Sequence, residues 1–311
     1  MNVNEIFQKI CEAPEDNELR LEYARLIEPS DPDHAELIRF QIGLAADRRL
    51  GTRLYGLEAT ERQLLEANSA RWAHNIAKFS AHGQTTLIEF DRGFPAHIRM
   101  HPDLFVEYAD FIFRLAPIRH IDFIKPYDED GKLLTDDNGN LVPFPMDRLL
   151  ACTQLSRLDS VGFSNVELKL GFPGDPGDVS KIAACPHLTR CQYLNFAFTT
   201  ITEYDYLALA EGELTRKMLV VAPLWRGVGE DLVHDIEVGQ GEYVRTDFSD
   251  EWKAVERRLG YIPWLHPSHN GVNRYDARWH FEQGKLPKYP PGSPQNPEWY
   301  DIPREWKRPS W

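Results

Sequence analysis

The sequence predicts an α/β fold: a short, irregular leucine-rich-repeat solenoid with an α-helical N-terminal cap and an extended, aromatic- and proline-rich C-terminal segment. The main observation is the pattern Leu-x-x-Leu-x-x-Leu-x-Leu, which recurs between residues 115 and 222. Three copies are well formed: Leu115, Ile118, Ile121 and Phe123; Leu155, Leu158, Val161 and Phe163; and Leu188, Cys191, Leu194 and Phe196. A fourth copy, at 214–222, is degraded. The segments before the second and third copies, LLACTQL and IAACPHL, also match each other.

Each repeat is expected to supply one short strand and a returning helix. The strands at 119–124, 159–164 and 192–197 should then be neighbours in one parallel sheet, with Leu194 and Phe196 in its core. We divide the chain accordingly into three parts. These are a helical cap region at 1–80, the repeats at 81–225 and a C-terminal region at 226–311.

The N-terminal part is predicted to be helical over residues 1–45, because apolar side chains recur there at helical spacing. A longer amphipathic helix is expected over 57–79, where it would cover the open end of the repeats with a polar outer face. The segment TTLIEF, at 85–90, is predicted to be the first strand. Further along, GFPGDPGD at 171–178 is rich in turn residues, and Asp178 is predicted to cap the helix that follows.

The stretch PEDNELRLEYARLIEPSDPDHAELIRFQ resembles the repeat-companion domain at the N-terminus of certain bacterial leucine-rich-repeat proteins. The residues that fit the pattern of that family are Arg20, Tyr23, Ala24, Glu28, Asp31, Glu36, Ile38, Arg39 and Gln41. Arg25 and Leu26 stand where the family usually has Asp and Trp. The resemblance covers about residues 5 to 222. It implies a fold and a binding style rather than a reaction.

The charge balance limits the classes of partner. The chain has a formal net charge of −13, which argues against nucleic acid, because phosphate binding needs a basic face. No apolar run approaches the roughly 20 residues of a membrane span, and the N-terminus lacks the pattern of a secretory signal. We therefore expect a cytoplasmic protein. The four cysteines form no CxxC pair and are expected to be buried thiols that act as small apolar side chains.

Candidate binding residues follow from the repeat register, because positions beside the last leucine of each strand face the concave surface of the sheet. We take Asp122, Ile124, Ser164 and Asn195 as the candidates. Most side chains predicted on this face are small or apolar. We therefore expect something bulky to fill it, either the aromatic tail of this chain or a partner.

The tail is the second candidate binding element. Six of the eight tryptophans lie in 252–311, and seven prolines lie between 287 and 309. Prolines remove backbone donors, so we expect residues 263–311 to form an ordered, extended strap that does not pair as a strand. The candidate contact residues in it are Trp264, Trp299, Trp306 and Trp311.

Catalytic and metal motifs are weak. His266 and His269 have an H-x-x-H spacing and His280 follows, but zinc needs three or four such ligands. Pro267 and Gly271 predict a loop there, where spacing fixes no geometry. The sequence has no G-x-S-x-G nucleophile motif and no glycine-rich phosphate or dinucleotide fingerprint. We expect no metal, no cofactor and no catalytic residues.

The favoured function is therefore a non-catalytic adaptor or scaffold that binds another protein or peptide. Its acidity favours a basic partner. One alternative is a metal-binding or enzymatic subunit with a His/Asp site in 260–282. The other is a structural subunit of a hetero-complex in which the tryptophan-rich tail docks.

Overall fold

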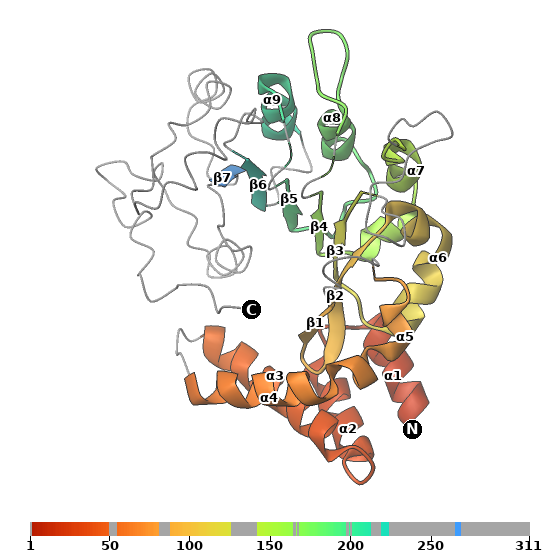
Figure 1. Cartoon of the computed structure of the whole chain (residues 1–311), viewed down its shortest axis with the longest axis vertical. Helices are drawn as coiled ribbons and strands as arrows, with labels where there is room; N and C mark the ends of the chain where they lie inside the picture. The colour runs from red at the N-terminus through yellow and green to blue at the C-terminus, as the bar shows by residue number, and fades with distance from the viewer. Residues whose placement is uncertain are drawn as a thin grey trace, which may run out of the picture. The chain divides into compact units, whose positions relative to one another are not determined.

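The computed structural model (Figure 1) describes residues 2–49, 55–80, 88–125, 142–163, 166, 168–196, 199, 201–212, 219–223 and 265–268. The chain forms two compact units. The first comprises residues 1–167 with 186–191, and the second comprises residues 168–185 with 192–311. Both combine helices with mostly parallel strands, so the predicted α/β class is confirmed. None of the helices in the described ranges is long and apolar enough to cross a membrane.

The first unit begins with five helices. They are α1 (Val3–Glu12), α2 (Asn17–Ile27), α3 (Pro32–Arg49), α4 (Tyr55–Trp72) and α5 (His74–Ala77). The start of α1 is fixed by a capping box, in which Asn2 accepts a hydrogen bond from the backbone of Glu5 and the Glu5 carboxylate accepts one in return. Asp16 caps α2 through the backbone N–H groups of its first turn. The helices predicted over 1–45 are confirmed, and the helix predicted over 57–79 ends at Trp72.

The apolar core of these helices surrounds one aromatic side chain of the first hairpin, Phe94. Its other buried members are Ile6, Ile10, Ala24, Ile27, Ala35 and Ile38. Tyr23 and Phe7 pack on the Phe94 ring with centroid separations of 5.2 and 5.9 Å. The hydrophobic effect therefore joins the N-terminal helices to the strand that contains Phe94.

Among the described residues of the first unit, the strands that follow are β1 (Ile88–Asp91), β2 (Phe94–Met100), β3 (His120–Phe123) and β4 (Ser160–Gly162). β1 pairs antiparallel with β2, whereas β2, β3 and β4 are parallel neighbours. Ile98 is paired with Ile121, and Ile121 with Val161. The register predicted between the first two repeats is thus confirmed. β2 comes earlier in the chain and pairs with β3 in the same parallel arrangement.

Helical segments cover the apolar face of these strands. They are α6 (Pro102–Leu115), α7 (Met146–Leu150) and a 3-10 helix (Thr153–Arg157). Phe105 of α6 contacts Phe123 with ring centroids 5.4 Å apart, and Phe123 contacts Phe163 at 5.9 Å. The apolar repeat positions therefore build a continuous core, as the periodicity predicts.

The second unit contains α8 (Asp178–Ala183), β5 (Tyr193–Asn195), α9 (Glu203–Glu211), β6 (Leu219–Pro223) and β7 (Leu265–Ser268). The three strands described in this unit are parallel, with Leu194 paired to Val220 and Val220 to Leu265. Leu194 and Phe196 are fully buried, which confirms their core assignment. The degraded fourth repeat nevertheless supplies a strand, β6.

Two predictions for the C-terminal region are wrong where the structure describes it. Leu265–Ser268 pairs with β6 as a strand, although the tail was expected to run unpaired, and His266 lies on this strand rather than in a loop. Pro267 is tolerated because β7 is last in the order of the described strands, where a missing backbone donor costs little. The rest of 263–311 lies outside the described residues.

The cysteines behave largely as expected. All four thiols are free, and Cys11, Cys185 and Cys191 are buried, whereas Cys152 is half-buried. Burial raises the pKa of the Cys11 thiol to about 12, which keeps it protonated at neutral pH. Cys11 and Cys152 also donate through sulfur, to the Arg114 carbonyl oxygen at 3.9 Å and to Gln154 Oε1 at 3.2 Å.

Candidate functional site

The residues predicted to face the concave surface do not form an open polar surface. Asp122 in β3 and Asn195 in β5 are both buried, and Ile124 is half-buried. Ser164 lies outside the described residues, as do Trp264, Trp299, Trp306 and Trp311. The first unit and the second unit contribute Asp122 and Asn195, respectively.

Asp122 belongs to a cluster of ionisable side chains that the sequence analysis missed. His97 in β2 lies between two carboxylates, with Nδ1 3.0 Å from Glu89 Oε2 and Nε2 3.1 Å from Asp122 Oδ2. Its side chain is 2% exposed. The His120 ring lies 6.4 Å from that of His97. Asp122 was predicted on this face, and β2 adds the buried, ionisable side chain of His97 beside it.

This cluster is poorly suited to acid–base catalysis. Both ring nitrogens of the buried His97 already lie close to a carboxylate oxygen, so neither is turned toward an open surface from which a substrate could exchange a proton. The cluster instead ties β1, β2 and β3 together through their side chains.

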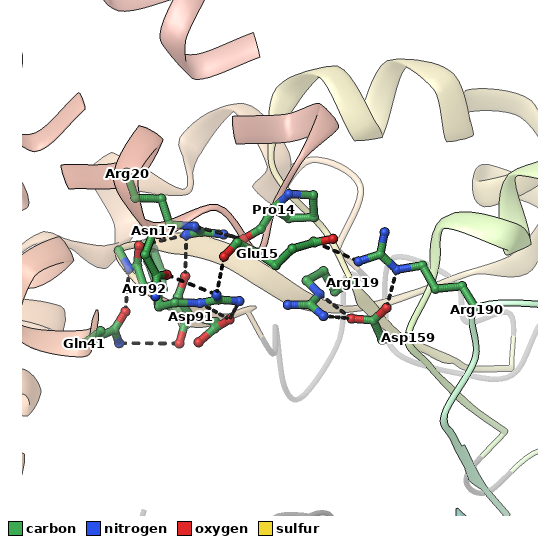
Figure 2. A network of polar contacts seen from close by, with 12 residues as sticks. Pro14, Glu15, Asn17, Arg20, Gln41, Asp91, Arg92, Arg119, Asp159 and Arg190 are labelled. Carbon is green, nitrogen blue, oxygen red and sulfur yellow. Dashed lines mark hydrogen bonds and ion pairs between the residues drawn. The ribbon is translucent and has the colours of Figure 1, made fainter. Parts of the chain in front are cut away.

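A second polar network holds the turn between β1 and β2 against the N-terminal helices (Figure 2). Arg20 of α2 is fully buried. Its Nε and Nη2 donate to the carbonyl oxygen of Pro14 at 3.0 and 2.6 Å, and Nη1 donates to those of Asp91 and Arg92 at 3.0 and 2.8 Å. Burial lowers the pKa of Arg20 to about 9. Three backbone carbonyls are thereby satisfied by one guanidinium.

The next residue of the turn, Gly93, is contacted on both of its backbone groups. Its N–H donates to Gln41 Oε1 at 2.6 Å, and its carbonyl oxygen lies 2.7 Å from His34 Nε2. Gly93 has a φ of 89°, and a Cβ built on it would lie 2.1 Å from the Cγ1 atom of Ile38. Only glycine fits both this dihedral angle and this space. We call the contacts of Arg20, His34, Ile38 and Gln41 to this turn the β1–β2 clamp.

An ionic chain extends the same network toward the repeats (Figure 2). Asp159 is bound by Arg119 and by Arg190, whose Nε lies 2.6 Å from Asp159 Oδ1. Arg190 Nη2 also donates to Glu15 at 2.8 Å. Arg157 occupies the position in the second repeat that Arg190 occupies in the third, and it donates to the carbonyl oxygen of Cys11 at 3.0 Å. Arg157 and Arg190 thus occupy equivalent positions in successive repeats, and both bind residues at or just after the C-terminal end of α1.

The residues that carry the repeat-companion resemblance are mostly engaged inside the first unit. Arg39 forms a bidentate ion pair with Glu28 at 2.7 and 2.6 Å. Asp31 accepts hydrogen bonds from Arg71 and from Trp72 Nε1. Together with the β1–β2 clamp, these contacts give the pattern a structural explanation.

The exposed apolar side chains differ from these polar groups. Four of the five large ones in the described ranges are aromatic. Two of them, Tyr108 and Phe111, lie on α6 and are each 38% exposed. The Phe79 ring contacts both, with centroids 5.6 and 6.0 Å away. Lys78 Nζ lies 5.2 Å and the Arg114 guanidinium carbon 5.8 Å from the centre of the Phe111 ring. We call these five residues the Phe111 patch.

No metal centre is found in the part of the chain that the structure describes. No group of three or more His, Cys, Asp or Glu side chains there could hold an ion. Of the candidate ligands, His266 lies on β7, while His269 and His280 fall outside the described ranges.

Comparisons with protein-family models, curated proteins and solved structures found no match to this chain.

Proposed function

We propose that this chain is a non-catalytic adaptor or scaffold that binds another protein or peptide. In this proposal it is a leucine-rich-repeat protein with an N-terminal repeat-companion domain, and it acts as a cytoplasmic subunit of a hetero-complex. The net charge of −13 favours a basic partner.

The observation that carries the proposal is the Phe111 patch. Aromatic side chains and arginine are enriched where protein interfaces have most of their binding energy. Tyr108 and Phe111 lie partly exposed on a helix whose other face is buried through Phe105 and Ile112. Phe79, which follows α5, contacts both rings, and side chains already packed on a neighbour lose less entropy when a partner binds.

The contrast with the ionisable groups supports binding over catalysis. His97, Arg20 and Asp159 are buried, and each is hydrogen-bonded or ion-paired within the first unit. A catalytic group must instead reach a substrate in hydrogen-bonding geometry. Apolar rings beside cations offer contact area rather than reactivity.

Affinity purification of the full chain from its native host tests the proposal. Tyr108→Ala/Phe111→Ala is compared with the intact sequence and with Leu26→Ala, which removes an exposed apolar side chain of α2. Quantitative mass spectrometry should show at least one protein that is depleted more than fivefold by the double variant and retained by Leu26→Ala. Identical sets of captured proteins for all three chains, each with an unchanged melting curve, would overturn the assignment of the patch.

A further inference from the structure

The exposed face of α6 has an ordered distribution of charge. Its exposed residues are Glu107, Tyr108, Asp110, Phe111 and Arg114. The acidic residues precede Phe111 and the basic residue follows it, an order that also complements the dipole of the helix. The face thus has an acidic start, an aromatic centre and a basic end.

Two of these charges are not neutralised by the chain itself. The Asp110 carboxylate accepts a hydrogen bond at 3.0 Å from a glutamine side chain that follows α6. By contrast, neither Glu107 nor Arg114 forms an ion pair with any residue that the structure describes. Glu107 interacts with the neighbouring Tyr108 hydroxyl, and the Arg114 guanidinium lies beside the Phe111 ring. One acid and one base on this face are therefore available for ion pairs with another molecule.

The spacing of these two charges makes the face complementary to its own reverse. Glu107 and Arg114 are seven residues apart. They lie on the same side of the helix but about 10.5 Å apart along its axis, too far to pair with each other. Their midpoint falls between Asp110 and Phe111. If a second α6 lies antiparallel across a two-fold axis at this midpoint, each Glu107 faces the Arg114 of the other copy.

The centre of the same face supplies apolar contact at the two-fold axis. The Phe111 ring is next to the midpoint, so the two copies of this ring meet there. Phe111 and Tyr108 are each 38% exposed, and an identical patch would remove both from water on both copies at once. Asp110 lies on the flank of the face, where its carboxylate is already hydrogen-bonded.

We propose that the Phe111 patch binds a second copy of this chain, with the two α6 helices antiparallel in a two-fold symmetric dimer. Phe111 lies at the axis, and Glu107 of each copy pairs with Arg114 of the other. Such self-complementary contacts are the rule in two-fold dimers, the commonest form of protein oligomer. Each copy carries a net charge of −13, so the two ion pairs act against a general repulsion that salt screens.

This inference rests on the proposed function in that it names what the Phe111 patch binds. A dimeric scaffold presents each of its other surfaces twice, and a partner held at two points is lost when the dimer dissociates. The two proposals can fail separately. A monomeric chain whose patch variants still lose a different protein in the affinity purification contradicts only the dimer. A dimeric chain that captures no other protein contradicts only the adaptor.

Sedimentation equilibrium of the full chain at about 0.15 M salt, where charges are screened beyond about 8 Å, tests the dimer. The intact chain should dimerise. Glu107→Arg and Arg114→Glu should each weaken the dimer at least tenfold, because like charges then face each other twice. The matched control is Arg25→Glu, which makes the same change of charge at an exposed position of α2 and should change the affinity less than twofold.

Restoration of the pair distinguishes a direct contact from a loss of structure. An equal mixture of Glu107→Arg and Arg114→Glu chains should form a mixed dimer within about threefold of the intact affinity, because each new arginine faces a new glutamate. The double variant Glu107→Arg/Arg114→Glu should dimerise with itself for the same reason. A monomeric intact chain, single variants as tight as the intact chain, or a mixture of well-folded variants that stays monomeric would each overturn the proposal.

Discussion

Two tight turns in the described part of the chain both contain a glycine of positive φ but differ in what surrounds it. The φ angle is 89° at Gly93 and 80° at Gly174, which lies in the turn Phe172–Asp175. At Gly93 the space for a side chain is filled by Ile38, and helices α2 and α3 contact the turn through Arg20, His34 and Gln41. A Cβ at Gly174 would meet nothing within 4 Å. The comparison teaches that local turn geometry alone does not show whether a turn stabilises the fold. Its burial and its contacts do.

The largest loss of stability is expected when the β1–β2 clamp is disrupted. Arg20→Met should lower the free energy of unfolding by about 3–5 kcal/mol, because the carbonyls of Pro14, Asp91 and Arg92 lose their donors in a buried place. The matched control is Arg25→Met on the same helix, where the side chain is exposed. Urea unfolding measures both. A midpoint for Arg20→Met equal to that of Arg25→Met would show that the clamp does not stabilise the fold.

The two glycines offer the sharpest matched pair. Gly93→Ala should cost about 2–4 kcal/mol, from the left-handed dihedral and from overlap with Ile38. Gly174→Ala should cost only about 1–2 kcal/mol, since the dihedral is unfavourable but the space is open. Thermal melts of the two variants check this order. Equal losses would mean that the two turns are equally constrained.

A change of pH is expected to have a smaller effect on the free energy of unfolding. Burial lowers the pKa of His34, which contacts the Gly93 carbonyl, below the usual 6.5. The unfolded chain then binds more protons than the folded chain in this range, so the stability from neutral His34 is present above pH 6.5 and declines as the pH falls below it. His34→Gln keeps a donor and removes the titration. Unfolding free energies at pH 7.5 and pH 5.5 should differ less in this variant than in the intact chain. A difference as large as in the intact chain would exclude His34 as a contributor.

The smallest effect on stability is expected at the exposed turn, where the Phe172 side chain is 55% exposed. Phe172→Ala should change the free energy of unfolding by less than about 0.5 kcal/mol, because surface positions without a structural role tolerate truncation. A loss above about 1 kcal/mol in urea unfolding would show that the ring packs on its own chain, and the comparison between the two turns would fail.

The apolar part of the fold could be predicted from the sequence because repeat periodicity reports directly which side chains face the core. Ile121, Val161 and Leu194 are all buried, and the first two are paired as the repeats predict. The strand β2 was not predicted from the repeats, because the two leucine-like positions that begin a repeat are missing before its buried Ile98 and Met100. His97 was missed with it.

Polar contacts between distant segments could not be predicted in this way. Asp178 was predicted to cap α8, but Gly177 occupies the N-cap position and makes no side-chain hydrogen bond. The Asp178 carboxylate instead binds the backbone of Lys169, nine residues earlier. The resemblance identified Arg20 and Gln41 as members of a pattern, yet their partner, the β1–β2 turn, is set by tertiary packing. Turn residues predicted the loop at 171–178, whereas the exposure of Phe172 needed the structure.

Hydrogen exchange of backbone amides in the full chain tests the contrast between the two turns most directly. The clamp protects the Gly93 amide through Gln41, so peptides covering 88–100 should exchange slowly. Peptides covering 169–178, where residues 172–176 are exposed, should exchange faster. Equal or slower exchange at 169–178 would contradict the division between a buried turn and an exposed turn.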